Sequence, residues 1–514
     1  MQTLDYDTEL LACAQSCWDN WNDFREDRDR CKRFTYGDQW SDTVDDGFTR
    51  TTEEKLLISQ GNLPLKNNLI RRLVRNVLGV YRNRWKMPEC RARDAAEAPQ
   101  AATLSLLLRC NMELNRMEEL YARTMEEFLI GGLAVHKKWY GRRGGMADCW
   151  TDLISPTQFF MDREARDFRG HDLSMLGEIH DIEFDRLCAA FATSQEHREE
   201  IGRIYGVDWR RPAPGVKCRL TEVWTRSHTP RYHCHDSLHG IRFIIPEEDF
   251  RTKVNAVNAA RIEAIGPNAR IIHARWQMDE EWRVSFLAPS GALLARAVSP
   301  YPGGSHPYII KAYPFVDGEI HSFVSDIIDQ QKITNRLISM YDWILRASAK
   351  GVLLFPEGAL PEGTDMADIA DEWSRFNGVI IYRPRPGIPI PQQVSSNSTN
   401  IGITELLSIQ MKMMEDISGV NGALQGKLDN TSMSGTLYSQ QTQNSLSALA
   451  DLLRSFDDFM LAGAEADAAN IRKFYTPARI AAIAGVHPGL APHLRSDARF
   501  FHTPFDITFS TPSN

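Results

Sequence analysis

The sequence has no run of eighteen apolar residues, which argues against a membrane-spanning helix. It begins MQTLDYDTEL, without the basic and then apolar residues of a secretory signal peptide, so we expect no leader. The nine cysteines are odd in number, widely spaced and absent after Cys234. This pattern favours free thiols in a reducing compartment over a disulfide framework.

Positive charge is also scarce. The chain has 59 Lys and Arg against 67 Asp and Glu, a formal net charge of −8. A protein that wraps nucleic acid tightly needs a surplus of basic residues to neutralise phosphates. The composition therefore excludes tight wrapping but is compatible with DNA that passes by without binding strongly.

No catalytic motif stands out. The stretch from Gly422 to Leu428 is one residue short of a phosphate-binding P-loop, and Leu428 stands where the magnesium-binding hydroxyl belongs. There is no G-x-S-x-G, no cysteine in a nucleophile context and no glycine-rich dinucleotide motif. We therefore predict that the protein is not an enzyme and needs no cofactor.

Histidines offer the one alternative of an enzymatic class, a metal-dependent nuclease or phosphohydrolase. In a strand His233 and His235 would share a face, but no zinc-type pairing of ligands supports a site. His-Asp pairs also occur at 171/172, 180/181 and 235/236. The metal candidates form one group: His228, His233, Cys234, His235 and His239.

The length of 514 residues exceeds what one core supports, so we expect two to four structural regions. With 43% apolar and 25% charged residues the chain has the composition of a soluble globular protein. Period and turn residues predict an α+β fold that is predominantly α-helical. Helices are expected at 5–34, 64–88, 99–130, 181–206, 246–266 and 434–474, with strands at 133–140, 149–155, 220–227, 231–235, 269–277, 281–289, 378–384 and near the C-terminus.

A long amphipathic helix is predicted from about Glu319 to Lys350, after a segment interrupted by Pro307, Pro314 and Gly318. Its apolar residues recur at helical spacing, which predicts that this side packs. Its polar side is expected to meet water or partner chains. That side holds Asp326, Asp329, Gln330, Lys332, Asn335 and Arg336.

Basic residues are concentrated in the predicted helix between Pro64 and Pro88, which has seven of them and no acidic residue between Lys66 and Lys86. One interpretation is a surface for DNA phosphates or an acidic partner. The other is a solvated helix face that pairs with acidic neighbours in the same fold or an adjacent subunit. The central residues are Arg71, Arg72, Arg75, Arg82 and Arg84.

Five stretches, in this order, resemble the portal protein (head-to-tail connector) of tailed bacteriophages, in its podovirus-like branch. None is a catalytic motif, but their order and spacing extend over most of the chain. They are RFTYGDQW (33–40), LPLKNNLIRRLVRNVLGVYRNRW (63–85), LISPTQFFMDREARDF (153–168), PFVDGEIHSFVSDIIDQQKITNRLIS (314–339) and residues 432–460.

The resemblance implies a portal fold with wing, stem, clip and crown regions, assembled as a ring, usually a dodecamer, around a central channel. Laid on this sequence, it places the wing at 1–245, the first stem helix at 246–264, a β-rich clip at 265–318, the second stem helix at 319–350, a wing return at 351–432 with a tunnel-loop candidate at 383–400, and wing-to-crown helices with a C-terminal strand at 433–514.

The implied function is a passive conduit at one capsid vertex for DNA packaging and ejection, assembled in the host cytoplasm and retained in the virion. Implied partners are other copies of the chain, the major capsid protein, the terminase large subunit, head-tail adaptor, neck and tail proteins, and double-stranded DNA, with no membrane. A coat or adaptor protein of the virion is a further alternative. The expected DNA-facing residues are Arg383, Arg385, Gln392, Gln393, Lys332 and Arg336.

Overall fold

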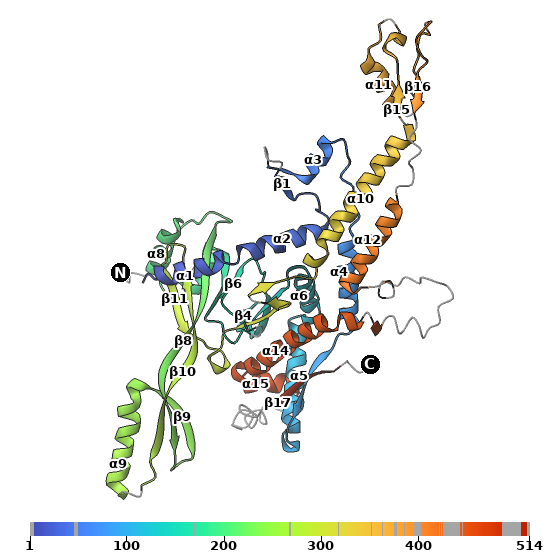
Figure 1. Ribbon diagram of the computed structural model, residues 1–514. Helices are drawn as coiled ribbons and strands as arrows, with labels where there is room; N and C mark the ends of the chain where they lie inside the picture. Colours follow the sequence, from blue (N-terminus) through green and yellow to red (C-terminus); the bar gives the residue numbers. More distant parts are fainter. Residues whose placement is uncertain are drawn as a thin grey trace. The chain divides into compact units, whose positions relative to one another are not determined.

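The computed structural model describes residues 5–45, 50–167, 170–266, 269–316, 318–350, 352–361, 363–374, 378–384, 386–394, 402–420, 422, 424, 443–444, 446–485 and 505–510. Figure 1 shows the elements in sequence colours. The chain divides into two compact units. Unit 1 comprises Met1–Asp29, Leu78–Ser322 and Ala450–Asn514, and unit 2 comprises Arg30–Val77 and Phe323–Leu449.

Unit 1 is built around a six-stranded antiparallel sheet of order β11-β10-β8-β7-β6, in which β9 also pairs with β8. Helices and antiparallel sheets are both prominent and do not alternate, which confirms the predicted α+β class. The strands are β6 (Phe159–Met161), β7 (Met175–Glu183), β8 (Lys217–Asp236), β9 (Ile241–Pro246), β10 (Ile272–Leu287) and β11 (Leu293–Val298).

Strands β8 and β10 are each continuous, where the sequence predicted two short strands joined by a turn. Pro230 lies where β8 is hydrogen-bonded to neither β7 nor β9, which end at positions opposite Thr225 and Arg231. Proline is tolerated at such an edge because no ladder needs its missing N–H. Its partner across the sheet is Met278, inside the polar stretch that was expected to turn.

An arm, residues 229–279, extends from this sheet (Figure 1). It consists of the far ends of β8 and β10, strand β9, and the helical stretch η2 (Glu247–Asp249), η3 (Arg251–Asn255) and α9 (Ala256–Ile265). One face of its sheet is covered, because Cys234, Ile245 and Ile272 are buried with Val254. The predicted helix at 246–266 is therefore present, although it begins with a 3-10 turn and a π turn.

Strands of the segment 265–318, which the resemblance places as the clip, pair with strands outside the segment. β10 pairs with β8 along its whole length, and β12 (Tyr308–Ala312) pairs with β4 (Leu133–Arg143). Long-range strand pairing of this kind leaves no local signal in the sequence. The remaining elements of the segment are η4 (Pro302–Gly304) and the short hairpin β13 (Phe315–Val316) and β14 (Glu319–Ile320).

The second sheet of unit 1 has the order β12-β4-β5, with β5 at Met146–Leu153. Besides α9, the described helices of unit 1 include α1 (Thr8–Asp19), the start of α2 (Asn22–Tyr36), α5 (Ala98–Leu114), α6 (Met117–Gly131), α7 (Phe184–Phe191), α8 (Gln195–Tyr205), α14 (Ala450–Phe474) and α15 (Pro477–Ala484). The C-terminal strand β17 (Phe505–Ser510) pairs with β3 (Met87–Ala92), which η1 (Ala95–Glu97) follows.

Several predicted helices are interrupted. The helix expected at 5–34 breaks between α1 and α2, and that expected at 99–130 breaks where Arg116 has a left-handed φ of 49°. The helix expected at 181–206 starts as strand β7 instead. The stop predicted at Gly131-Gly132 is confirmed: Gly132 has φ 73°, and a Cβ there would lie 2.5 Å from the carbonyl oxygen of His321.

Unit 2 contains the rest of α2, β1 (Thr43–Asp45), β2 (Arg50–Thr52), α3 (Glu53–Ser59) and most of α4 (Leu69–Arg82). It also contains α10 (Ser325–Lys350) and α12 (Ile403–Ser418), which pack side by side (Figure 1). The chain that connects α10 to α12 forms what we call the terminal module, residues 352–394. It contains β15 (Val352–Leu354), η5 (Glu357–Ala359), α11 (Met366–Ser374) and β16 (Gln392–Val394). Residues 378–384, predicted as a strand, do not form one.

The interior of unit 1 contains one fully buried ion pair. Lys138 of β4 contacts Asp467 of α14, with 2.5 Å between Nζ and Oδ2 and only 1% and 5% of the two side chains exposed. A buried pair costs desolvation, so its net contribution to stability is small, but removing one partner leaves the other charge uncompensated. The pair therefore fixes where α14 lies on the sheet.

We expect Asp467→Ala to lower the free energy of unfolding by about 3–5 kcal/mol, because it strands the Lys138 ammonium. Urea denaturation measures this. The control is Asp458→Ala, whose carboxylate is 69% exposed beside Lys311 and should cost less than about 1 kcal/mol. The double change Lys138→Met with Asp467→Leu should recover most of the loss. Equal losses for Asp467→Ala and the control would contradict this account.

Candidate functional site

Helix α10 buries Ile327 and Ile328 in its first turns, but further along it buries polar side chains and exposes apolar ones. Asn335 is 1% exposed and Gln331 is fully buried, together with Thr334 and Ser339. The expectation that the polar side of this helix meets water or partners is therefore wrong at Asn335. The exposed apolar residues are Ile333, Met340, Tyr341, Trp343 and Leu345, at 39–51%.

The buried amide of Gln331 caps helix α4. Its Oε1 accepts from the backbone N–H groups of Leu69 (3.0 Å) and Ile70 (3.3 Å), and its Nε2 donates to the carbonyl of Asn67 at 2.7 Å. The first N–H groups of a helix have no partner within the helix. A side chain usually supplies one from the residue before the helix. Here the cap comes from 262 residues further along the chain.

Two further side chains of α10 continue this contact. Asn335 accepts from the N–H of Asn67 at 3.2 Å and donates to the side chain of Gln39 at 2.7 Å. The hydroxyl of Ser339 accepts from the N–H of Leu65 at 3.1 Å. The irregular segment that precedes α4 is thus held on α10 by side-chain amides and a hydroxyl.

Ion pairs also link α10 to an earlier part of unit 2. Lys332 contacts Asp42 (3.0 Å) and Glu53 (2.7 Å), and Arg336 contacts Glu53 at 3.2 Å. Burial would raise the pKa of Asp42, but the hydrogen bond and charge of Lys332, with help from Arg30 and Arg33, hold it below its usual value. Lys332 is only 16% exposed, whereas Arg336 keeps 57% of its side chain exposed.

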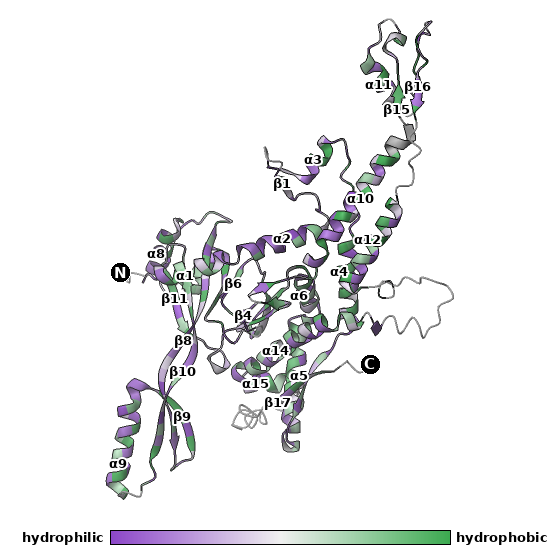
Figure 2. Ribbon diagram, in the orientation of Figure 1, coloured by the Kyte–Doolittle hydropathy of each residue, from purple (hydrophilic) through white to green (hydrophobic). Residues whose placement is uncertain are grey.

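Helix α12 adds a second exposed apolar face. Residues 406, 409, 413 and 417 recur at helical spacing and so lie on one side. Its other side is buried through Ile403 and Met414. Figure 2 shows hydrophobic residues along both α10 and α12. The exposed residues of α12 are Leu406, Ile409, Met413 and Ile417, at 46–49%; with those of α10 we call them the apolar stripe.

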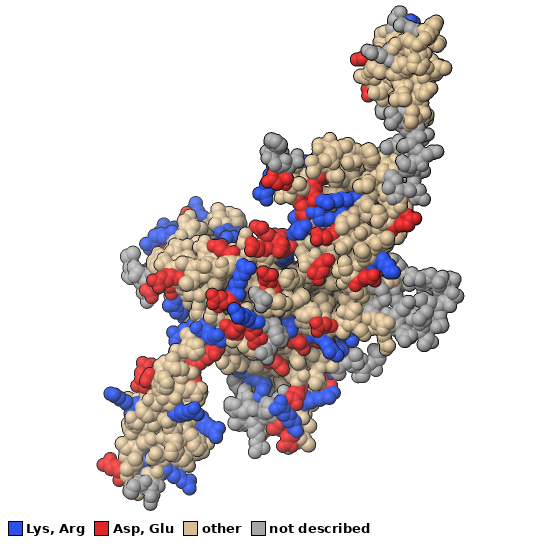
Figure 3. Space-filling view, in the orientation of Figure 1, with Lys and Arg blue, Asp and Glu red and all other residues tan. Residues whose placement is uncertain are grey.

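The terminal module is also apolar at its surface, and Figure 3 shows few charges on the face in view. Of the predicted DNA-facing residues, Gln392 and Gln393 lie exposed in β16, paired with β15. The backbone N–H of Arg383 donates to Ala359, and its side chain is exposed. Arg385 lies outside the described residues. Exposed apolar residues here are Leu354, Val379, Ile381, Ile390 and Val394, at 48–73%.

The basic residues of α4 divide into two sets. Arg71 lies over the ring of Tyr36, 4.7 Å from its centre, and Arg72 is 3.9 Å from Glu415 of α12. These two contacts within unit 2 agree with the interpretation of a helix face that pairs within its own fold. Arg75, Arg82 and Arg84 are exposed, and the choice between the two interpretations applies to them.

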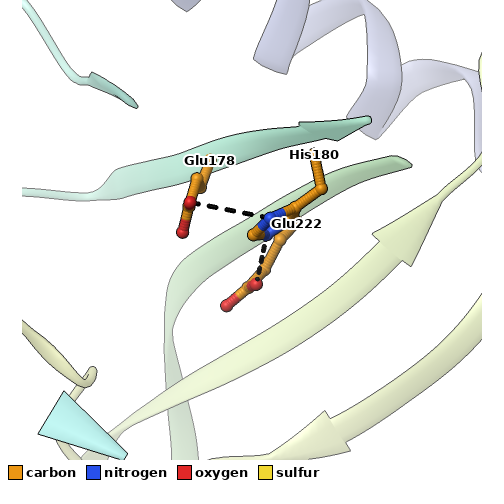
Figure 4. Close-up of side chains that lie close together, drawn as sticks. All are labelled: Glu178, His180 and Glu222. Carbon is orange, nitrogen blue, oxygen red and sulfur yellow. Dashed lines mark hydrogen bonds and ion pairs between the residues drawn. The ribbon is translucent and has the colours of Figure 1, made fainter. Parts of the chain in front are cut away.

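Figure 4 shows a group of possible metal ligands in unit 1: Glu178 and His180 of β7 with Glu222 of β8. Glu178 and Glu222 are directly opposite each other in the sheet. His180 Nε2 lies 2.9 Å from Glu222 and its Nδ1 lies 3.6 Å from Glu178. Carboxylates and imidazole are ligands that zinc accepts, so the neighbours of the group decide its role.

The ammonium of Lys137 occupies the place of a cation in this group. Its Nζ lies 2.6 Å from Glu222 and 3.4 Å from Glu178. Glu222 also accepts from Trp224 and from Tyr308. Burial would raise the pKa of Glu222, but Lys137 and His180 outweigh it and hold the pKa well below its usual range. The two carboxylates and the imidazole thus already have partners in a buried ion-pair network. A metal ion would have to displace the Lys137 ammonium.

The group of His and Cys predicted from sequence is not brought together as one site. His233 and His235 do share a face, as expected, but Cys234 is buried on the opposite face with Val254 of η3. His239 pairs with Asp236 at 2.8 Å. Of the His-Asp pairs, 180/181 is divided, since His180 joins Glu222 while Asp181 pairs with Arg219.

Within the described residues, no helix is long and apolar enough to cross a bilayer, and all nine cysteines are free thiols. Exposed large apolar side chains along two packed helices are typical of a subunit of a larger assembly. The chain belongs to the phage P22-like portal protein family, whose model matches residues 12–487. No curated protein matches the chain.

Family membership confirms the resemblance seen in the sequence. It makes the protein a bacteriophage portal protein, a structural component of the virion associated with genome packaging. The family is structural rather than enzymatic, in agreement with the prediction from motifs. The histidine groups therefore gain no support as a nuclease or phosphohydrolase site.

Removing the distant cap should loosen the start of α4. In Gln331→Leu the N–H of Ile70 loses its partner, and the N–H of Leu69 and the carbonyl of Asn67 keep only their bond to each other. An unsatisfied buried group costs about 1–3 kcal/mol. We expect faster hydrogen exchange at the amides of residues 67–70. The control is Asp329→Asn, an exposed change on the same helix. Unchanged exchange in Gln331→Leu would contradict the capping role.

Acid should destabilise unit 1 through His306, which packs on Trp282 with ring centres 4.8 Å apart. Burial lowers the pKa of His306 to about 4. The unfolded chain, with a histidine pKa of about 6.5, then binds more protons than the folded one between these values. Stability is full above about pH 6.5 and falls toward pH 4. His306→Gln should show a smaller drop in urea midpoint from pH 7 to pH 5; an identical drop would contradict this assignment.

Proposed function

We propose that this portal protein assembles as a closed ring, usually of twelve copies, at one vertex of the capsid, and that DNA passes through its channel during packaging and ejection. The observation that carries the proposal is the family match over residues 12–487. Closed rings are the usual outcome when one surface of a subunit binds a different surface of the next copy.

The apolar stripe supports ring assembly. Nine large apolar residues of α10 and α12 are exposed by 39–51% in the single chain. Soluble monomers seldom leave contiguous apolar surface of this extent uncovered. In the proposed ring the α12 side of one subunit covers the α10 side of its neighbour. Inside its own subunit α10 uses the polar residues already described together with Ile327 and Ile328.

The same observations support a revised division into parts. We propose α10 and α12 as the two stem helices and the terminal module, residues 352–394, as the clip between them. This replaces the initial placement of the first stem helix at 246–264 and the clip at 265–318. Those segments are built into the sheets and the arm of unit 1, which we assign to the wing, with residues 433–514 leading toward the crown.

The charge pattern suits a conduit that does not hold DNA. Each phosphate contact adds salt-dependent affinity and slows sliding, and the chain is net acidic at −8. We propose that Arg336, Arg383, Gln392 and Gln393 face the DNA path. Lys332 is assigned instead to holding the loop around Asp42, since its ammonium is engaged there.

The clip is proposed to dock the packaging motor through the terminase large subunit, and later the head-tail adaptor and tail proteins. Its exposed apolar residues, such as Val379 and Ile381, provide the kind of surface that protein interfaces bury. The wing is proposed to contact the major capsid protein. These assignments rest on family membership together with exposure.

The double variant Ile409→Asp with Met413→Asp should prevent ring assembly, because it places two carboxylates in the apolar stripe. We expect monomers or small oligomers by light scattering and no rings in electron micrographs, with unchanged circular dichroism. The control is Lys412→Glu, an exposed residue of α12 about one sixth of a turn from Ile409 and about a quarter of a turn from Met413. It should assemble normally.

If the double variant forms rings as readily as the wild type, the stripe is not the interface. If the wild type itself forms no ring at any concentration, the proposed assembly is wrong.

A further inference from the structure

The open face of the arm carries three histidines. In the sheet register His235 of β8 is directly opposite His273 of β10, and His233 is two residues before His235. Side chains of directly opposed and alternate residues point to the same side. The other side of this sheet is the one on which Val254 of η3 packs. His235 and His273 are exposed and His233 is half-buried.

The spacing of these positions suits three ligands of one ion. Directly opposed residues have Cβ atoms about 4.5–5.5 Å apart, and diagonal neighbours about 7–8 Å apart. Alternate residues of one strand are about 6.6 Å apart, from a rise of about 3.3 Å per residue. Imidazole rings that project from such a triangle are able to converge on an ion with bonds of about 2.0–2.1 Å.

Asp279 provides the second observation. Both of its carboxylate oxygens lie near Nε2 of His233, at 2.7 and 2.9 Å. A carboxylate accepts, so Nε2 donates in this contact, and a metal ion would bind through the lone pair of Nδ1. Histidine ligands of metals characteristically donate their other N–H to a carboxylate in this way, which fixes the tautomer and the ring orientation.

We propose that His233, His235 and His273 bind a divalent transition-metal ion on the open face of the arm, with Asp279 orienting His233. His233 binds through Nδ1, and the rings of His235 and His273, being exposed, turn to meet the ion. Three imidazoles leave the fourth position of a tetrahedral ion open to water or to a ligand from another molecule.

Neighbouring charges set the expected selectivity. Arg242 is directly opposite His235 on β9, and Arg275 is directly opposite His233 on β10. Both are exposed, and both oppose a bound cation. They favour ions with the strongest affinity for imidazole, Cu²⁺ above Ni²⁺ and Zn²⁺, and they favour an anionic fourth ligand. Binding should weaken below about pH 6.5, where imidazoles take up protons.

The test is a titration of the full-length chain, free of any histidine tag, with Zn²⁺ and separately with Ni²⁺, in competition with a chromophoric chelator. We expect one ion per chain. His235→Gln and His273→Gln should each weaken binding at least about tenfold, and Asp279→Asn should weaken it while leaving all three ligands in place. The control is His239→Gln, in the same arm but paired with Asp236, which should bind as the wild type does.

Absence of binding by the wild type would overturn the proposal, as would wild-type affinity in both His235→Gln and His273→Gln. Loss of the ion on His180→Gln would assign it instead to the group of Glu178, His180 and Glu222. Circular dichroism of each variant checks folding. The readout is metal affinity rather than assembly, so its outcome is separate from that of the ring proposal.

Discussion

The contact between the side-chain amides of α10 and the backbone before α4 determines how unit 2 is built. Gln331 satisfies the first N–H groups of α4, and Asn335 and Ser339 hold the residues that precede it. These partners are desolvated, so each buried amide must keep its bonds or lose about 1–3 kcal/mol. Gln331, Asn335 and Ser339 are therefore committed to their own subunit, together with the ion pairs of Lys332.

The inward position of these polar side chains bears on how subunits associate. While Gln331, Asn335 and Ser339 face inward, five large apolar residues of α10 remain exposed, and α12 contributes four more. The burial of apolar surface is thus incomplete in a single chain. For a member of the portal family, the proposed completion is a neighbouring subunit in a ring. Buried polar groups then define the fold of the subunit, and apolar burial drives its association.

Local signals in the sequence predicted several elements well. Helical spacing located α10, the helix expected at 99–130 ends where α6 does, and strands were expected where β4 and β5 lie. The side of α10 that would be buried was not predictable. Periodicity identifies which residues share a face, but it does not reveal that a distant backbone supplies donors to Gln331. The break expected between the strands at 220–227 and 231–235 is absent for the same reason, since only the pairing of β8 shows that Pro230 lies at an edge.

The residues of the candidate sites were likewise predictable only where they are close together in the sequence. His233 and His235 were correctly predicted to share a face because two residues separate them, whereas His273 joins them only through the register of β10. The network of Lys137, Glu178 and Glu222 comes from three strands and has no local pattern. Lys332 was expected to face DNA. Its contacts with Asp42 and Glu53 come from a distant part of the chain, since Asp42 lies 290 residues earlier.

Symmetry-resolved electron microscopy of the assembled protein tests the central claim most directly. The account predicts a closed ring in which Ile409 and Met413 of one subunit are buried against α10 of the next, while Gln331 still caps α4 within its own subunit. A ring in which the apolar stripe remains exposed to solvent, or particles with no closed ring, would contradict it.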